Sequence, residues 1–424
     1  MRIFADLHIH SKYSRGTSKN MDIKHIEKYA KIKGLNLLGT GDFTHPEWLK
    51  ELKNNLEIEE ETGILKSKNG MNFILQTEVS NVYEKGDKKR AIHNLIFAKN
   101  FEIAEQINDI LSKYGNLKAD GRPTLNLDCA EMVEILKNLD KSIEIIPAHA
   151  WTPWFGVFGS KSGFNSLKEC FEDMKKHIFA IETGLSSDPA MNWRVKELEN
   201  ISLVSNSDSH SFWPWRIGRE CNVFDLKKLS YDDLFKAIKT REGFLYTIEF
   251  HPEEGKYHYD GHRKCGVCMH PKQAKVRNDL CPICGKKLTV GVLHRVEDLA
   301  DYPEGYKPKN AVPFYKLVPL AELIAKYYNT TPNTKKVLSL YFDLIKKFGN
   351  EFNILLYVDK NELKKAIGED LANLIIKNRE GKIRVIPGYD GVYGKIVIDE
   401  KEAEKEIQAN ENNMKKQKSL FEFK

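Results

Sequence analysis

Short apolar runs alternate with amphipathic segments over residues 1 to about 250 of the chain. Between several of the runs, apolar positions recur at helical spacing, as in residues 22–33 and 130–138. Such alternation predicts parallel strands joined by crossover helices, in an α/β barrel or a doubly wound sheet. The apolar runs are residues 3–8, 35–39, 72–76, 92–98, 144–147, 179–182 and 202–205.

The positions of histidines and acids favour the barrel. Most of them fall at or just past the C-terminal end of an apolar run, and α/β barrels gather their active sites at the C-terminal face. His93, at the start of its run, is the exception.

The hydrophobic pattern changes after Phe250. A stretch without periodic apolar positions comes first, and helical periodicity then dominates, as in residues 335–347 and 361–377. Two short strands are expected at residues 383–386 and 394–398, on either side of a turn rich in glycine. We therefore expect a barrel over residues 1–250, a small module over 251–295, a mainly helical domain with short strands over 296–399 and a flexible tail over 400–424.

Length and composition indicate a globular protein of more than one domain. The chain has 424 residues, of which 41% are hydrophobic and 30% charged. No apolar run approaches the roughly 18 residues that span a bilayer, and the N-terminus lacks the apolar segment of a signal peptide. A soluble, cytoplasmic protein is expected. Lys and Arg exceed Asp and Glu by 66 to 60, a mild surplus.

Metal-binding side chains recur along the predicted barrel. His8 and His10 are two residues apart, so in a strand their imidazoles project to the same side. Imidazoles and carboxylates that converge from several strands suit two or three divalent ions of the Zn, Mn or Fe kind. The further candidates are Asp42, His45, Glu78, His93, His149, Asp208 and His210.

Four of the seven cysteines form two CxxC pairs, Cys265 with Cys268 and Cys281 with Cys284. Each pair can direct two thiolates at one tetrahedral ion, so we expect a closed, structural Zn²⁺ site. Residues 261–292 hold seven Lys or Arg against one acid. This surplus either binds phosphate or is simply a solvated surface. The other cysteines are expected in the core: Cys129, Cys170 and Cys221.

The order of the metal-binding motifs resembles the polymerase-and-histidinol-phosphatase (PHP) family. The resemblance implies a distorted seven-stranded α/β barrel with three metal ions, held by His8, His10, Glu78, His93, His149, Asp208 and His210. Two positions depart from the family pattern. Phe43 stands where the family usually has a histidine directly after the aspartate, here Asp42. The acidic or histidine ligand that the family commonly has shortly after the first motif is also missing, and Arg15 lies in that neighbourhood. Asp42 or His45 is then expected to substitute as a ligand.

The parts outside the barrel narrow the resemblance to the endonuclease Q family. The segments HPEEGKYHYDGHRKCGVC and IPGYDGVYGKI look like that family's own. The resemblance implies a DNA repair endonuclease that cuts 5′ of hypoxanthine, uracil, xanthine or an abasic site and leaves a 3′-hydroxyl. It further implies metal-activated hydroxide as the nucleophile, Zn²⁺ in the cysteine site and in the barrel, Mg²⁺ or Mn²⁺ for catalysis, and DNA binding by the helical domain.

Aromatic residues are the candidates for contacting DNA. Five of the six tryptophans lie between positions 151 and 215, and four of them follow His149 or His210 closely. They either stack on a displaced base or pack as core residues. The candidates for substrate binding are Trp151, Trp154, Trp213, Trp215, Tyr389 and Tyr393.

The end of the chain resembles the box by which DNA enzymes dock on the sliding clamp (PCNA). Gln417, Leu420 and Phe423 have the spacing that places an apolar plug on one helical turn. An intracellular, nucleoid-associated protein is expected. Three other functions remain open: a PHP phosphatase of small phosphate esters, a 3′→5′ exonuclease and a DNA-binding adaptor without catalysis.

Overall fold

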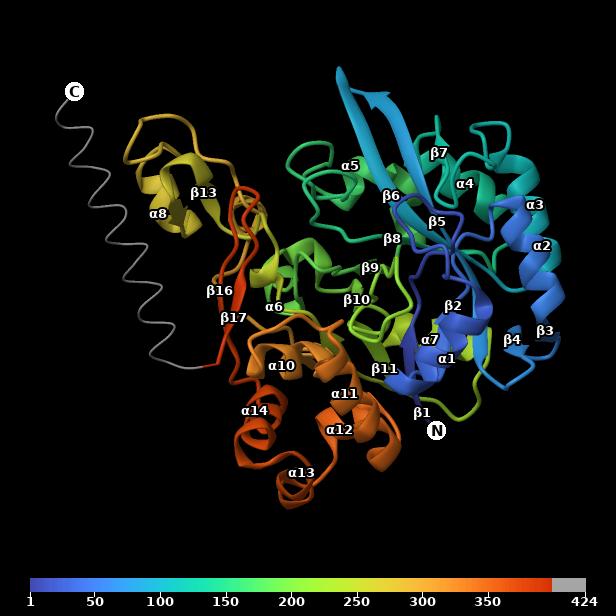
Figure 1. Ribbon diagram of the computed structural model, residues 1–424. Coiled ribbons are helices and arrows are strands. Elements are labelled where there is room, and N and C mark those ends of the chain that lie inside the picture. The colour runs from blue at the N-terminus through green and yellow to red at the C-terminus, as the bar shows by residue number, and fades with distance from the viewer. Residues whose placement is uncertain (399–424) are drawn as a thin grey trace.

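The computed structural model describes residues 1–398, so the clamp-like box lies outside the described residues. It confirms all seven apolar runs of the first 250 residues as strands (Figure 1). They are β1 (Arg2–Asp6), β2 (Leu37–Gly39), β5 (Asn72–Lys85), β6 (Lys88–Ala98), β8 (Glu144–Pro147), β9 (Ala180–Glu182) and β10 (Ser202–Val204).

The fold is mixed α/β, built on an 11-stranded sheet. Its main path runs β15-β12-β11-β1-β2-β5-β4-β3, with β6 attached to β5 and β8, and β7 to β5. Strands β1, β2 and β5 are parallel neighbours, whereas β6 runs antiparallel to both β5 and β8. The other strands are β3 (Leu56–Glu59), β4 (Ile64–Ser67), β7 (Thr124–Leu125), β11 (Cys221–Asp225), β12 (Phe244–Glu249) and β15 (Phe314–Lys316).

A separate parallel pair, β9 and β10, lies between β8 and β1. The backbone N–H of Ala150, after β8, donates to Glu182 of β9 at 3.0 Å. The N–H of His10, after β1, donates to Ser209 after β10 at 3.0 Å. The loops that follow β1, β8, β9 and β10 are thereby brought side by side.

Helices cover the sheet, and polar caps set where several of them begin. Asp22, for example, accepts a hydrogen bond from the backbone of His25 and caps the first helix. The helices of this part are α1 (Ile23–Lys33), α2 (Pro46–Asn55), α3 (Phe101–Leu111), α4 (Cys129–Leu139), α5 (Leu167–Phe171), α6 (Pro189–Asn192) and α7 (Tyr231–Thr240), with 3₁₀ turns η1 (Glu172–His177) and η2 (Lys196–Leu198).

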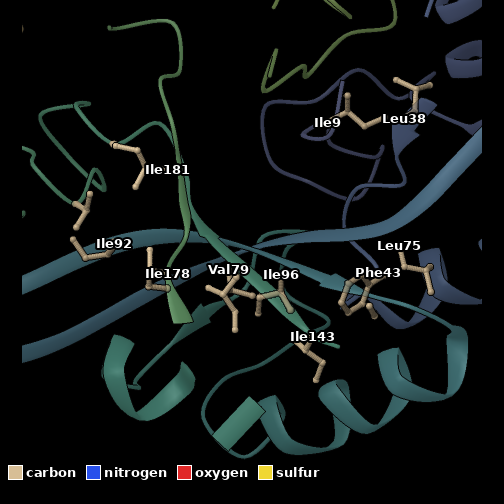
Figure 2. Close-up of a cluster of buried hydrophobic side chains, with 14 of the residues drawn as sticks. Ile9, Leu38, Phe43, Leu75, Val79, Ile92, Ile96, Ile143, Ile178 and Ile181 are labelled. Carbon is tan, nitrogen blue, oxygen red and sulfur yellow. The ribbon is translucent and has the colours of Figure 1, made fainter. Parts of the chain in front are cut away.

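The core lies between the sheet and these helices. Figure 2 shows part of it, where Val79 of β5 lies beside Ile96 of β6, and Leu38 of β2 lies beside Ile9. Phe43, which directly follows Asp42, is fully buried in this cluster. Its ring therefore occupies core volume and takes no part in metal binding.

The segment after β12 forms a module with a small core of its own, made by Val267, Met269, Ala274 and Leu288 together with two cysteines. Its elements are η3 (Pro252–Glu254), β13 (Asp260–His262), η4 (Arg263–Cys265), β14 (Val267–Met269), α8 (Pro271–Val276) and α9 (Val292–Leu299).

Helices then dominate, and one expected helix is broken. Residues 361–377 form two helices, because Gly368 between them has a φ of 82° that favours glycine and interrupts the helical backbone. Hairpin β16–β17 follows and extends toward the module (Figure 1). The elements are α10 (Leu320–Tyr327), α11 (Lys335–Phe348), α12 (Glu351–Leu356), α13 (Lys360–Ile367), α14 (Glu369–Arg379), β16 (Arg384–Ile386) and β17 (Lys395–Val397).

A buried ion pair joins α1 to the C-terminal helices. Lys33 Nζ lies 2.7 Å from Glu351 Oε1, which also accepts from the N–H of Leu320 at 3.1 Å. The other carboxylate oxygen accepts from the Tyr341 hydroxyl at 2.7 Å. Within residues 1–398, no helix combines the length and the apolar character needed to cross a membrane.

We predict that Glu351→Ala destabilises the protein by about 3–5 kcal/mol in urea unfolding, because Lys33 is left charged and buried. Replacing both partners by Met and Leu should recover most of that loss, since no charge then remains. Lys99→Ala removes an exposed pair with Asp232 and serves as the control, with a cost below about 1 kcal/mol. Equal losses in the two single variants would contradict the prediction.

Candidate metal centre

Loops and strands that meet at one edge of the sheet place the histidines and acids. His8 and His10 follow β1, His149 follows β8 and Asp208 follows β10, whereas Glu78 lies within β5 and His93 within β6. Asp42, His149 and Asp208 have positive φ values of 45°, 28° and 47°. Non-glycine residues rarely adopt this conformation, and such strain gathers at functional sites.

The side chains form two groups that share Glu78. Four donor atoms, from His8, His10, Glu78 and Asp208, lie within 4.8 Å of one another, and so do those of Glu78, His93 and His149. Glu78 Oε2 lies 3.1 Å from His10 Nε2. Its other oxygen, Oε1, lies 2.7 Å from His93 Nδ1 and 3.0 Å from His149 Nε2. One carboxylate can therefore bridge two ions.

Buried atoms without hydrogen bonds show that the first group fits a cation. His8 Nε2, His10 Nε2 and Asp208 Oδ1 are buried and make no hydrogen bond. Yet Asp208 Oδ1 lies 3.4 Å from His8 Nε2 and 3.1 Å from His10 Nε2. Nitrogen and carboxylate ligands that converge in this way match first-row divalent metals.

Burial and neighbouring charges shift the pKa values of the side chains in both groups. Burial alone would raise the pKa of Glu78, but His93, Arg122 and His8 hold it well below its usual value. Burial likewise lowers the pKa of His8, and the carboxylates of Glu182, Asp208 and Glu78 outweigh this and raise it well above its usual value. Burial takes the pKa of His93 down to about 4, so this imidazole is neutral and ready to act as a ligand.

Asp42 supports a ligand and does not join either group. Its carboxylate accepts from His10 Nδ1 at 2.9 Å, from the N–H and hydroxyl of Ser11 at 2.6 and 2.7 Å, and from the Ser14 hydroxyl at 2.9 Å. The expectation that Asp42 coordinates metal is thus corrected, because donors already surround both oxygens.

His45 and His210 also lie outside both groups. His45 stacks on Tyr13, with ring centroids 4.4 Å apart, at the start of α2. His210 lies closer, with its ring centroid 4.4 Å from that of His10, but its Nδ1 is 2.9 Å from the carbonyl oxygen of Asp208. His210 therefore borders the first group, whereas His45 packs away from it.

Two residues that the sequence patterns do not reveal complete the surroundings of the ligands. Glu182 lies 3.0 Å from His8 Nδ1 and accepts from the N–H of His149 at 2.7 Å, so it fixes ligands of both groups. Arg122 Nη1 lies 3.1 Å from Glu78 Oε2. Glu182 ends an apolar run, as other site residues do, whereas Arg122 lies in a segment without a motif.

The aromatic candidates differ in how far their side chains are exposed. Trp151 is only 1% exposed and donates to Asn192 at 2.7 Å, and buried Trp215 stacks on half-buried Trp213 at 4.8 Å. These rings pack, so the expectation that Trp151 and Trp215 hold a base is corrected. Trp154 and Tyr393 are 60% and 68% exposed.

Tyr389 packs against the module. Its ring covers Gly261, where an added Cβ would lie 2.3 Å from it. Its backbone forms a bridge with Tyr259. Tyr389 therefore helps to hold hairpin β16–β17 on the module, and it offers little surface to a ligand.

A cleft of about 870 Å³ opens beside the second group. Thr152, in its wall, lies 2.9 Å from His149 Nδ1 through its hydroxyl. At another wall, Lys256 Nζ lies 5.6 and 5.8 Å from the ring centroids of Tyr257 and Tyr393. The remaining walls come from the segment before β11, from η3, from α10 and from the start of α9.

The cysteine module gathers a different set of ligands from the one expected. His262, Cys265, Cys281 and Cys284 lie together, and Cys268 lies apart near the carbonyl of Pro387, at 3.9 Å. The set therefore differs from the expected four cysteines. The register of β13 and β14 explains the difference, because Cys268 pairs with Gly261 whereas His262 pairs with Val267. Neighbouring strand positions face opposite sides, so His262 points at the other cysteines and Cys268 away from them.

This fold, with one carboxylate shared between two groups of ligands, defines a metal-dependent enzyme of the α/β class. The lesion-specific endonuclease PfuEndoQ from Pyrococcus furiosus has a similar structure, with a TM-score of 0.85 and 34% identity over 94% of this chain and 96% of that one. A structure of endonuclease Q with a 27-mer duplex carrying an abasic lesion at its active site has a TM-score of 0.83 and 34% identity, over 95% of this chain and 98% of that one. The chain belongs to the endonuclease Q family of metal-dependent nucleases.

Two further comparisons concern parts of the chain. Residues 319–382 match the family described as the MJ0043 C-terminal domain. The uncharacterized protein MJ0043 from Methanocaldococcus jannaschii is 38% identical over 253 residues, which are 58% of this chain and 31% of that protein. The chain thus spans about a third of the length of that relative.

We predict that His262→Ala loses about one zinc ion per chain relative to the unaltered protein, because a closed tetrahedral site needs its fourth ligand. Cys268→Ser should keep the full zinc content, since its thiol faces away from the group. Elemental analysis of the purified variants measures both. Loss of zinc from the Cys268 variant alone would restore the four-cysteine assignment.

Proposed function

We propose that the protein hydrolyses the phosphodiester bond on the 5′ side of hypoxanthine, uracil, xanthine or an abasic site in DNA, leaving a 3′-hydroxyl. The observation that carries the proposal is the pair of ligand groups joined by Glu78, with the cleft opening beside them. A relative of 34% identity has been captured with a duplex whose abasic lesion lies at the active site, which supports damaged DNA as the substrate.

The two groups would hold the metals. His8, His10, Glu78 and Asp208 supply one set of ligands, and Glu78, His93 and His149 the other. Bound divalent ions lower the pKa of a coordinated water and neutralise charge on a departing oxygen. We propose Mg²⁺ or Mn²⁺ for catalysis, and Zn²⁺ in the module and in the barrel. Strands β1, β2, β5, β6, β8, β9 and β10 supply the walls of the proposed seven-stranded barrel.

The protein's own side chains orient the ligands and meet the substrate. Asp42 and Glu182 fix the imidazoles of His10 and His8, so each presents Nε2 to the site. Arg122 supplies a positive charge beside Glu78, where the charge of the phosphate would be balanced.

The cleft would receive the base displaced from the helix. Damaged bases pair weakly, so extruding them costs less, and this already favours damaged over intact DNA. Tyr393 and Trp154, both exposed, would contact bases or backbone around the opening. The basic module and the helical domain, residues 296–399, would hold the flanking duplex. A sliding clamp (PCNA) is proposed as the partner of Gln417, Leu420 and Phe423.

We predict a single cut immediately 5′ of the lesion when a 5′-labelled duplex with one deoxyinosine is incubated with the protein and Mg²⁺ or Mn²⁺. Asp208→Asn should abolish the cut, because the first group loses a charged ligand. Asp232→Asn, at an exposed position on α7, should cut as the unaltered protein does. A ladder of shortened ends on damaged and intact duplexes alike would indicate an exonuclease instead.

We predict that Arg122→Met lowers the cleavage rate by about 10²–10³-fold while the metal content of the protein stays the same, because a positive charge beside the reacting phosphate is lost. Arg122→Lys should recover part of the rate. Single-turnover cleavage and elemental analysis separate this role from a structural one. If metal content falls together with the rate, Arg122 acts by holding Glu78.

A further inference from the structure

The loop that follows β8, residues 151–165, contacts both imidazoles of the second ligand group. The backbone N–H of His93 donates to the carbonyl of Phe155 at 2.8 Å, and the two rings stack with centroids 4.3 Å apart. The Thr152 hydroxyl donates to the carbonyl of His149 at 3.0 Å and lies 2.9 Å from Nδ1 of the same residue. Because that hydroxyl has only one proton, it accepts from Nδ1–H, and Nε2 keeps its lone pair for a metal.

The loop holds these contacts in a strained and crowded backbone conformation. Phe155 has a φ of 66°, in the left-handed region that residues other than glycine rarely adopt. An added Cβ at Gly156 or Gly159 would lie 2.6 or 2.4 Å from the carbonyl oxygen of Thr152, so the chain doubles back on itself there. Such a conformation persists only where the surrounding structure fixes it.

Arg295 fixes the loop from outside. Its Nε donates to the carbonyl of Phe158 and its Nη2 to the carbonyl of Phe164, both at 3.0 Å. Nη2 also donates to the side chain of Asn165 at 2.8 Å. The planar guanidinium holds its donors in a fixed arrangement, so three bonds from one group define the path of the loop. Arg90 of β6 reaches the same loop and lies 4.0 Å from the ring centroid of Phe164.

Arg295 lies on α9, and α9 is joined to β13, the strand that ends at the module ligand His262. Asp260, on β13, is fully buried and contacts the helix twice. Its Oδ1 accepts from the N–H of Gly291 at 2.7 Å, and its Oδ2 lies 2.6 Å from Nδ1 of His294. A continuous series of contacts therefore runs from the cysteine module through β13 and α9 to the loop and the second ligand group.

We propose that Arg295 is a positioning residue through which zinc in the module strengthens metal binding by the second ligand group. When zinc holds His262, β13 and α9 keep Arg295 against the loop, and the loop orients His93 and His149. Loss of residues that orient metal ligands lowers metal affinity by about 10–100-fold. This role rests on the metal sites of the proposed function, but it can be measured without a substrate.

The test is a Mn²⁺ titration of protein dialysed against a chelator until one zinc ion per chain remains. Electron paramagnetic resonance follows the free Mn²⁺, and elemental analysis counts the zinc. Arg295→Met should keep the module zinc and weaken one class of Mn²⁺ sites by about tenfold, because the loop loses three bonds. Arg295→Lys keeps the charge and can replace one of those bonds, so it should recover part of the affinity.

Two further variants identify the ligand group and the module. His149→Ala lacks a ligand of the second group, so adding Arg295→Met should weaken Mn²⁺ binding no further. His262→Ala lacks the module zinc and should weaken the same class of sites by about tenfold, and adding Arg295→Met should change little more. A further loss in the His149→Ala protein, or independent losses from His262→Ala and Arg295→Met, would overturn the proposal.

The matched control is Arg379→Met on α14, which also removes three bonds to the chain. Arg379 donates to three carbonyls at 2.7, 3.0 and 2.9 Å, those of Leu355, Ile354 and Val358. Its Tm should fall by an amount comparable to that in Arg295→Met, while its Mn²⁺ affinity should stay within about twofold of that of the unaltered protein. Equal weakening of Mn²⁺ binding in the two variants, or unchanged binding in Arg295→Met, would contradict the assigned role.

Cleavage of the deoxyinosine duplex gives a separate readout. In Arg295→Met, the Mn²⁺ concentration for half-maximal rate should rise by about tenfold, a larger factor than the fall in the maximal rate. A lower maximal rate with an unchanged Mn²⁺ requirement would mean that Arg295 does not act through the metal, and the proposal would be wrong. If the unaltered protein cuts no duplex, the proposed function fails, whereas the Mn²⁺ titration still decides the role of Arg295.

Discussion

The buried carboxylate of Glu78 is the group around which the site is organised. A charge in the interior is tolerated only when opposite charges and polar donors surround it closely. Here His10, His93, His149 and Arg122 approach its two oxygens at 2.7–3.1 Å. Because the residue lies within β5, at the centre of the sheet, the loops after β1, β8 and β10 must converge on it. The convergence of those loops in turn fixes where the cleft can open.

A second layer of acids makes this convergence rigid. Glu182 contacts His8 of one group and the backbone of His149 of the other, so one carboxylate links the two groups. Asp42 orients His10 in the same way, through its contact with Nδ1. The sequence departs from the PHP pattern at Phe43, and the structure shows the consequence, since that ring fills the core while Asp42 supports a ligand.

Local sequence patterns predict only part of this arrangement. The strands and the positions of His8, His149 and Asp208 could be predicted, because burial leaves periodic apolar runs and active sites follow strand ends. Glu78 differs, because β5 continues past it to Lys85. Strand register could not, and it is register that turns His262 toward the cysteines and Cys268 away. The sequence also does not show which aromatic side chains are buried. Trp151 is buried and Trp154 is exposed, although they are only three positions apart.

The cleft is lined by side chains from segments that are distant in the sequence. Its walls come from Thr152, Arg219, Glu254, Glu322 and Tyr393, which lie far apart in the sequence and meet only in the folded chain. The ligand groups lie on β5, β6 and the loops after β1, β8 and β10, whereas much of the cleft wall comes from η3, α10 and the segment before β11. Because the two sets of side chains come from different elements, a substitution in the wall of the cleft need not disturb the ligand groups.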